Sequence, residues 1–432
     1  MAKYSTILHR RRHDAVRNLL LAALGAFMLF MPASASAAQD AEVLVHVFGS
    51  DGSGAGGVEP YGGVVLDSSG NAYGTANYGG AFGRGLVWEM YRGANGQWTE
   101  KRIYNFGEAN GDDSYGPLAG LVFDHAGSLY GTTIGGGQPA GQAGTVFELS
   151  LDIDGEWIYK RIHTFGVAEG QQPRSAVVFD SAGNLYGNTS EGGAYNEGTI
   201  FKLIRGSDGT WLEQTLYSFG ANSQDSGGAF QPVALDASGN IWGTLYTGGT
   251  YGLGAIFELS PNSSGDWIET IVYSFPGGTN GEYPQCGLIF DAKGNLYGTV
   301  SYGGSSDEGL VYELSPSGNG GWTMTTLYDV GNVEGFIPYG SLTFGKSGNL
   351  YGATWQGGPL EMGNIYALHL SPAGVWTGKN IHSLRGGLQG CRPDGPVAMD
   401  SAGNLYDTTL LCGEGQGTNG AGVVFEIATT QE

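Results

Sequence analysis

The sequence predicts an all-β protein, a seven-bladed β-propeller built of four-stranded blades. One nonapeptide motif recurs seven times, at spacings of 54 to 57 residues. Each copy contains four short apolar segments separated by Gly, Asn, Asp and Ser. A further β-like segment stands ahead of the first copy and indicates how the ring closes. Four strands per repeat at this period are typical of propeller blades.

The repeated motif is represented by FDSAGNLYG at 179–187, and its Asp position falls at residues 67, 124, 180, 236, 291, 345 and 400. An Asp, a Gly and an Asn between two apolar runs favour a hairpin turn, because Asp oxygens bond backbone amides and Gly adopts the left-handed conformation. A calcium loop is the alternative, but it needs several converging oxygen ligands. Since Gly345 replaces Asp in the sixth copy, we expect turns, with no metal site and no cofactor.

The four strands of the third copy are expected in AVVFD, NLYGNT, GTIFKL and WLEQTLYSF. These segments are rich in Val, Ile, Tyr and Phe, which favours strands. The fourth segment begins at a tryptophan in six copies: Trp98, Trp157, Trp211, Trp267, Trp322 and Trp376. A parallel β-helix is the structural alternative, but its rungs are much shorter than this repeat.

The ring is expected to close through its N-terminal segment. Seven first, second and third strands are present, but only six fourth strands begin at a tryptophan. The segment EVLVHVFG at 42–49 aligns with the fourth strands of other copies. We therefore predict that it completes the last blade and leaves no open sheet edge.

The first 38 residues have the features of a signal peptide, followed by one propeller domain at 39–432. Basic residues, among them Arg10 and Arg17, precede a 13-residue apolar run and a cluster of small residues. An uncleaved N-terminal anchor is the alternative. Removal of residues 1–38 changes the net charge from −22 to −26, which argues against nucleic acid and anionic membrane surfaces as partners. No further apolar run could span a membrane, so we expect a secreted, periplasmic or cell-surface protein.

Three cysteines are compatible with such a compartment. Cys391 and Cys412 fall in loops of one blade and could form a disulfide. Cys286 stands in an apolar strand and is expected to be a buried free thiol.

Candidate ligand-binding residues gather in the inter-blade loops and the loops between second and third strands. Carboxylates stand beside aromatic residues there, and such pairs suit stacking on sugar rings with hydrogen bonds to hydroxyls. Packing between blades is the alternative role for these aromatics. The candidates are Tyr61, Tyr115, Tyr283, Tyr339 and Trp355.

No catalytic residue is predicted. His46, His163 and His382 share a repeat position with tyrosines, which indicates a half-buried place in the fourth strand instead of a general base.

The blocks D-x-x-G-N-L-Y-G-T-T, G-G and G-x-V-F-x-L recur over residues 42–427. In these blocks the sequence resembles the GloVer (Gloeo/Verruco) tandem-repeat family of secreted choice-of-anchor proteins. The resemblance implies exported repeats and carries no established activity.

The favoured function is a binding or interaction module, acting as a monomer on a polysaccharide or another surface protein. An extracellular carbohydrate hydrolase or lyase and a structural surface protein are the alternatives. Two carboxylates meeting across the central channel, one of them desolvated, would favour the enzyme.

Overall fold

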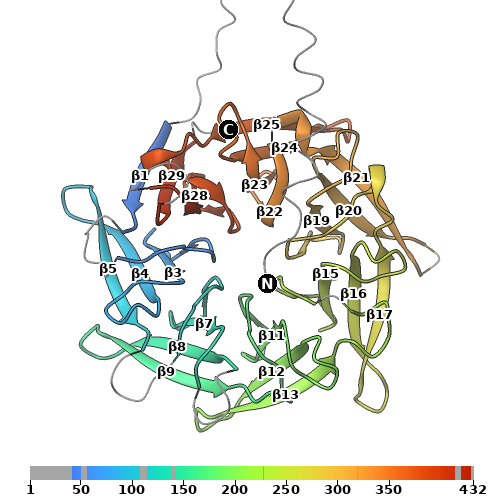
Figure 1. Cartoon of the computed structure of the whole chain (residues 1–432), viewed down its shortest axis with the longest axis horizontal. Helices are drawn as coiled ribbons and strands as arrows, with labels where there is room; N and C mark the ends of the chain where they lie inside the picture. Colours follow the sequence, from blue (N-terminus) through green and yellow to red (C-terminus); the bar gives the residue numbers. More distant parts are fainter. Residues whose placement is uncertain are drawn as a thin grey trace, which may run out of the picture. The chain divides into compact units, whose positions relative to one another are not determined.

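The computed structural model describes residues 41–49, 56–107, 114–137, 143–226, 228–318, 320–333, 335–413 and 420–429. The predicted signal peptide at 1–38 lies outside this part of the chain. The described residues form seven antiparallel sheets around a central axis, which confirms the seven-bladed propeller (Figure 1). In the described part of the chain, no helix has the length and apolar character needed to cross a membrane.

Six blades take their four strands in sequence order, from the central axis outward (Figure 1). The first two blades comprise β2 (Val65–Leu66), β3 (Ala72–Ala76), β4 (Leu86–Arg92) and β5 (Trp98–Asn105), then β6 (Val122–Phe123), β7 (Leu129–Thr133), β8 (Thr145–Leu151) and β9 (Trp157–Thr164). The next two comprise β10 (Val178–Phe179), β11 (Leu185–Thr189), β12 (Thr199–Arg205) and β13 (Trp211–Ser218), then β14 (Ala234–Leu235), β15 (Ile241–Leu245), β16 (Ala255–Pro261) and β17 (Trp267–Ser274).

The fifth blade comprises β18 (Ile289–Phe290), β19 (Leu296–Val300), β20 (Leu310–Pro316) and β21 (Trp322–Asp329), and the sixth β22 (Gly335–Phe344), β23 (Leu350–Gly357), β24 (Asn364–Leu370) and β25 (Trp376–Ser383). The short 3-10 helices are η1 (Gly278–Asn280), η2 (Val330–Val333) and η3 (Gly387–Gln389). The first strand is two residues long in blades one to five, shorter than the sequence pattern indicated.

The last blade is completed by β1 (Ala41–Val47), as predicted. Its other strands are β26 (Cys391–Pro393), β27 (Ala398–Met399), β28 (Leu405–Leu411) and β29 (Val423–Ala428). β1 pairs antiparallel with β29, and the register shifts between Leu44 and His46. β12 shows the equivalent irregularity against β13, between Ile200 and Phe201. β1 therefore pairs with β29 in the same way as β13 pairs with β12, although β1 comes from the other end of the chain.

The Asp motif forms a hairpin turn whose carboxylate is used internally. One oxygen of Asp180 accepts hydrogen bonds from the backbone N–H groups of Ala182 and Asn184, each at 2.9 Å. The other accepts from Asn184 Nδ2 at 2.8 Å and from the Tyr186 hydroxyl at 3.2 Å. Gly345 keeps the backbone bond across its turn, in which its N–H donates to the Asn349 carbonyl at 2.8 Å.

The core lies between neighbouring blades. A fully buried aromatic ring at the end of the fourth strand meets a third-strand ring of the next blade, as Phe48 meets Trp88 at 5.8 Å and Phe165 meets Phe201 at 4.9 Å. The tryptophan that begins the fourth strand packs on a second-strand tyrosine of the preceding blade. Because each blade buries its rings against the next, stability depends on a closed ring.

The three histidines occupy fourth strands, and two of them are half-buried as predicted. His382 is more enclosed than expected, with 4 % exposure. Its Nε2 lies 2.9 Å from an Oε2 of Glu42, on the strand that closes the ring. The closing strand therefore covers this histidine.

Candidate functional site

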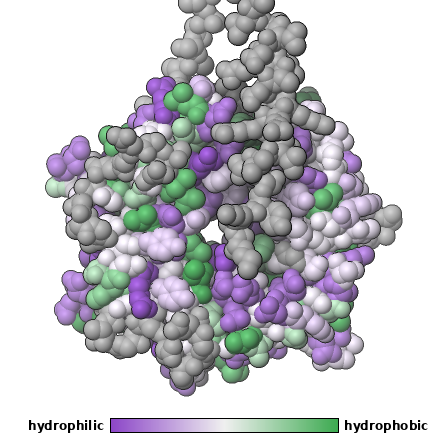
Figure 2. Space-filling model, viewed as in Figure 1, coloured by the Kyte–Doolittle hydropathy of each residue, from purple (hydrophilic) through white to green (hydrophobic). Residues whose placement is uncertain are grey.

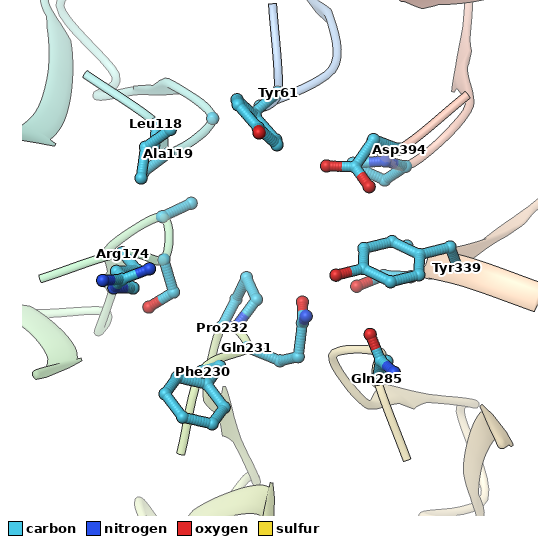
Figure 3. A pocket seen from close by; sticks show the side chains of 18 of the residues that line it. Tyr61, Leu118, Ala119, Arg174, Phe230, Gln231, Pro232, Gln285, Tyr339 and Asp394 are labelled. Carbon is cyan, nitrogen blue, oxygen red and sulfur yellow. The ribbon is translucent and has the colours of Figure 1, made fainter. Parts of the chain in front are cut away.

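The side chains at one position of the repeat all face a central cavity of about 470 Å³. The position lies six residues before each Asp position, at the inter-blade loop end of the first strand. Its seven side chains, here called the central ring, all line the cavity (Figure 3): Tyr61, Leu118, Arg174, Phe230, Gln285, Tyr339 and Asp394. A space-filling view shows an opening near the centre of the face, with hydrophobic residues at its edge (Figure 2).

The central ring is chemically diverse. The residue before it is proline in six blades and Ala229 in the fourth. The ring itself combines three aromatic side chains, one aliphatic, one amide, one guanidinium and one carboxyl group. Gln231 and Tyr246, both from the fourth blade, add a second amide and a fourth aromatic ring to the lining. Apolar surface with a few polar groups of different kinds is the usual composition of a small-molecule site.

Hydroxyl and amide side chains of the second strands hold the loops that carry the ring. Thr132 donates to the carbonyls of Pro173 and Ser175 on either side of Arg174, at 3.3 Å each. Asn188 Nδ2 donates to the carbonyl of Gln231 at 2.6 Å. Thr408 of the last blade donates to the Pro60 carbonyl at 2.8 Å and so ties the last blade to the first. These bonds fix the positions of the cavity residues before any ligand arrives.

The residue two positions before the central ring has a left-handed backbone in every blade. The seven φ angles lie between 54° and 72°: Glu59, Gly116, Gln172, Gly228, Tyr283, Ile337 and Arg392. Only two of these are glycine, although side chains other than glycine rarely adopt this conformation. Strain of this kind costs on the order of 1 kcal/mol or more per residue and gathers at functional sites.

Three of these left-handed residues contact a side chain of the cavity wall or of the layer behind it. The side chain of Gln172 accepts a hydrogen bond from the Arg174 guanidinium. The ring of Tyr283 lies 5.1 Å from that of Tyr246. The Arg392 guanidinium lies 4.3 Å from the centre of the Trp355 ring. The strained backbone thus places a second layer of side chains around the cavity.

Charge is unevenly distributed within the cavity. Arg174 lies on one side, and Asp394 and Tyr339 lie on the other (Figure 3). Burial raises the pKa of Asp394 to about 7, so near neutral pH its carboxyl group both donates and accepts hydrogen bonds. Burial also raises the pKa of Tyr61 to about 12, with the charges of Glu59 and Asp394 adding to the effect. The tyrosine hydroxyls therefore remain protonated.

A second carboxyl group, Asp407, lies behind Asp394 in the last blade. Its side chain has 0 % exposure, and in the other six blades this position is glycine. One oxygen accepts the Thr408 N–H at 2.7 Å, and among the described residues the other has no hydrogen-bond partner. Burial raises the pKa of Asp407 well above its usual range, and Asp394 adds to the effect.

The five residues proposed from the sequence occupy three different settings. Tyr61 and Tyr339 line the cavity. Tyr283 and Trp355 lie in the second layer, against Tyr246 and Tyr339 respectively. Tyr115 lies on the loop rim, where it pairs with Gly135 and covers it.

Sequence reasoning missed other polar or aromatic lining residues, among them Arg174, Phe230, Gln231, Tyr246, Gln285 and Asp394. An alignment of the seven repeats contains a signal for most of these residues. The position directly after the recurring proline, six residues before each Asp position, holds side chains of mixed chemistry, and all seven of them line the cavity.

Two of the three cysteines form a disulfide in the last blade, and the third is free. Cys391, in β26, forms a disulfide with Cys412, just after β28, and their Cα atoms lie 5.4 Å apart. This bond braces the blade that carries Asp394. Cys286 is a buried free thiol.

The propeller is similar to solved structures of known proteins. An ancestral GH74 enzyme matches over 87 % of this chain, with a TM-score of 0.57 and 12 % identity. The chain spans 48 % of that enzyme's length, so the similarity concerns the fold alone. A luciferin-regenerating enzyme matches over 72 % of this chain and 90 % of its own, with 14 % identity and a TM-score of 0.42. A protein of unknown function from Dyadobacter fermentans matches over 90 % and 98 %, with 12 % identity and a TM-score of 0.44.

Comparison with curated protein sequences finds no match. The model of the Gloeobacter/Verrucomicrobia repeat matches residues 35–232 and 230–432. These two segments cover all seven blades that the structure describes. The chain therefore belongs to the Gloeobacter/Verrucomicrobia repeat family.

Proposed function

We propose that this protein is an exported saccharide-binding module, and that its central ring holds one sugar residue of a polysaccharide. The mixed chemistry of the ring position supports the proposal most strongly, because seven blades of one repeat direct aromatic, apolar, amide and charged groups into one cavity. Aromatic faces stack on sugar rings, and amide, guanidinium and carboxyl groups bond hydroxyls. The disulfide and the repeat family are compatible with a location outside the cytoplasm.

The arrangement of acidic groups supports binding over hydrolysis. Glycoside hydrolysis generally uses two carboxyl groups that flank the scissile bond, roughly 5 to 9.5 Å apart. Across the cavity from Asp394 stands Arg174, with no carboxylate among the lining residues that the structure describes there. Asp407 belongs to the same blade as Asp394 and is fully buried. A ligand in the cavity would thus meet one accessible carboxyl group.

Glycan-array screening followed by isothermal titration calorimetry tests this function. Tyr61→Ala and Tyr339→Ala each remove one aromatic face from the ring. Since an aromatic stacking contact contributes about 1 kcal/mol, we expect each variant to lose roughly fivefold or more in affinity.

Tyr251→Ala is the matched control, because Tyr251 is a 59 % exposed tyrosine outside the cavity. Its affinity should equal that of the wild type. The proposal fails if no saccharide binds, or if the Tyr251 and Tyr61 variants lose affinity equally.

A further inference from the structure

The cavity contains a cation that the rest of the protein leaves unneutralised. Arg174 is the basic residue among the described lining side chains, in a chain with a formal net charge of −22. Its Nε donates to the Ser190 hydroxyl at 3.2 Å, and one terminal nitrogen donates to the Gln172 side chain. Both partners are neutral. None of the described carboxylates forms an ion pair with it.

Two arginines that join neighbouring blades, Arg92 and Arg205, are paired with acids. Arg92 forms an ion pair with Glu426 at 2.6 Å, and Arg205 lies within ion-pair distance of Asp124 and Glu148. Those pairs join neighbouring blades and have a structural role. Arg174 differs from these two because its partners are neutral, and its side chain is exposed on a wall of the cavity.

Beside this cation lie the groups that would hold a sugar ring. Tyr61 lies close enough to Arg174 and Asp394 for both charges to act on its hydroxyl group. Gln231 and Gln285 project towards the middle of the cavity, and Tyr339 faces Arg174 from the far side (Figure 3). Guanidinium groups match carboxylates with two parallel hydrogen bonds.

We infer that the saccharide is acidic, and that a uronic acid residue sits in the central ring with its carboxylate on Arg174. The aromatic rings then contact the faces of the sugar, and its hydroxyls meet Gln231, Gln285 and Asp394. This inference rests on the proposed saccharide-binding function and adds the class of ligand. A neutral sugar would leave the guanidinium without a counter-charge.

Calorimetry with matched ligands tests the inference. Trimers of galacturonate, glucuronate and mannuronate are compared with their methyl esters, which keep the shape and lose the charge, and with neutral trisaccharides. We expect one of the uronate trimers to bind at least tenfold more tightly than its methyl ester, because a hydrogen bond to a charged group is stronger than a neutral one.

Arg174→Gln should remove this preference, lowering uronate affinity at least tenfold while changing ester affinity less than twofold. Lys293→Gln is the charge-matched control, since Lys293 is an exposed cation in the Asp turn of the fifth blade and lies outside the cavity. It should preserve the preference. Equal binding of uronate and ester by the wild type, or an unchanged preference in the Arg174 variant, overturns the inference.

The pattern of failure separates the two proposals. If neutral trisaccharides bind and lose affinity in Tyr61→Ala, while uronates bind no better, the acidic ligand is wrong and the saccharide-binding function stands. If none of the saccharides binds, both are wrong.

Discussion

Closure of the ring by β1 makes a quantitative prediction at Phe48. The side chain is fully buried, and its ring lies 5.8 Å from Trp88 of the first blade. Replacing a buried Phe by Ala generally costs about 3 to 5 kcal/mol, from lost transfer energy and the cavity left behind. We therefore expect Phe48→Ala to lower the free energy of unfolding by that amount, measured by urea unfolding followed by tryptophan fluorescence.

Phe165→Ala is the internal control for this experiment. Phe165 occupies the same repeat position, is also fully buried and packs 4.9 Å from Phe201. Its strand, however, follows the rest of its blade directly in sequence, whereas β1 comes from the opposite end of the chain. The two variants should lose stability to within about 1 kcal/mol of each other. A loss below about 1 kcal/mol for Phe48→Ala, beside the full loss for Phe165→Ala, would refute closure by β1.

Two further predictions concern the last blade. Burial raises the pKa of Asp407, so the folded protein keeps a proton that the unfolded chain releases above about pH 4. The free energy of unfolding therefore falls as pH rises, by up to about 1.4 kcal/mol per pH unit. Asp407→Asn should reduce this slope and be more stable than the wild type at pH 7, and parallel slopes in urea unfolding at pH 5, 6 and 7 would contradict this. The Cys391–Cys412 disulfide closes a loop with a sequence separation of 21, so its reduction should lower the free energy of unfolding by about 3 kcal/mol, and an unchanged urea midpoint in reductant would argue against it.

The architecture could be predicted because strand pairing leaves a periodic trace in the sequence. The Asp turn, the third-strand block and the leading tryptophan each recur once per blade, and the segment at 42–49 supplies the missing strand. The extra length of β22 and the split of the last blade's first strand into β26 and β27 leave no such periodic trace in the sequence.

The site could be predicted only in part, because the direction of a side chain depends on single backbone angles. Tyr61 and Tyr339 directly follow the recurring proline and point into the cavity. Tyr283 precedes it, has a φ of 57° and joins the second layer, while Gln285 follows it and lines the cavity. Aromatic content cannot distinguish these neighbours, and both positions vary between blades.

The most direct test of the proposed site is a crystal structure of the protein with a bound uronate trimer. The structure predicts one uronate residue between Tyr61 and Tyr339, with its carboxylate oxygens within hydrogen-bond distance of the Arg174 guanidinium. A trimer bound on the outer rim near Tyr251, a carboxylate directed at Asp394, or an empty cavity at saturating ligand would contradict the assignment.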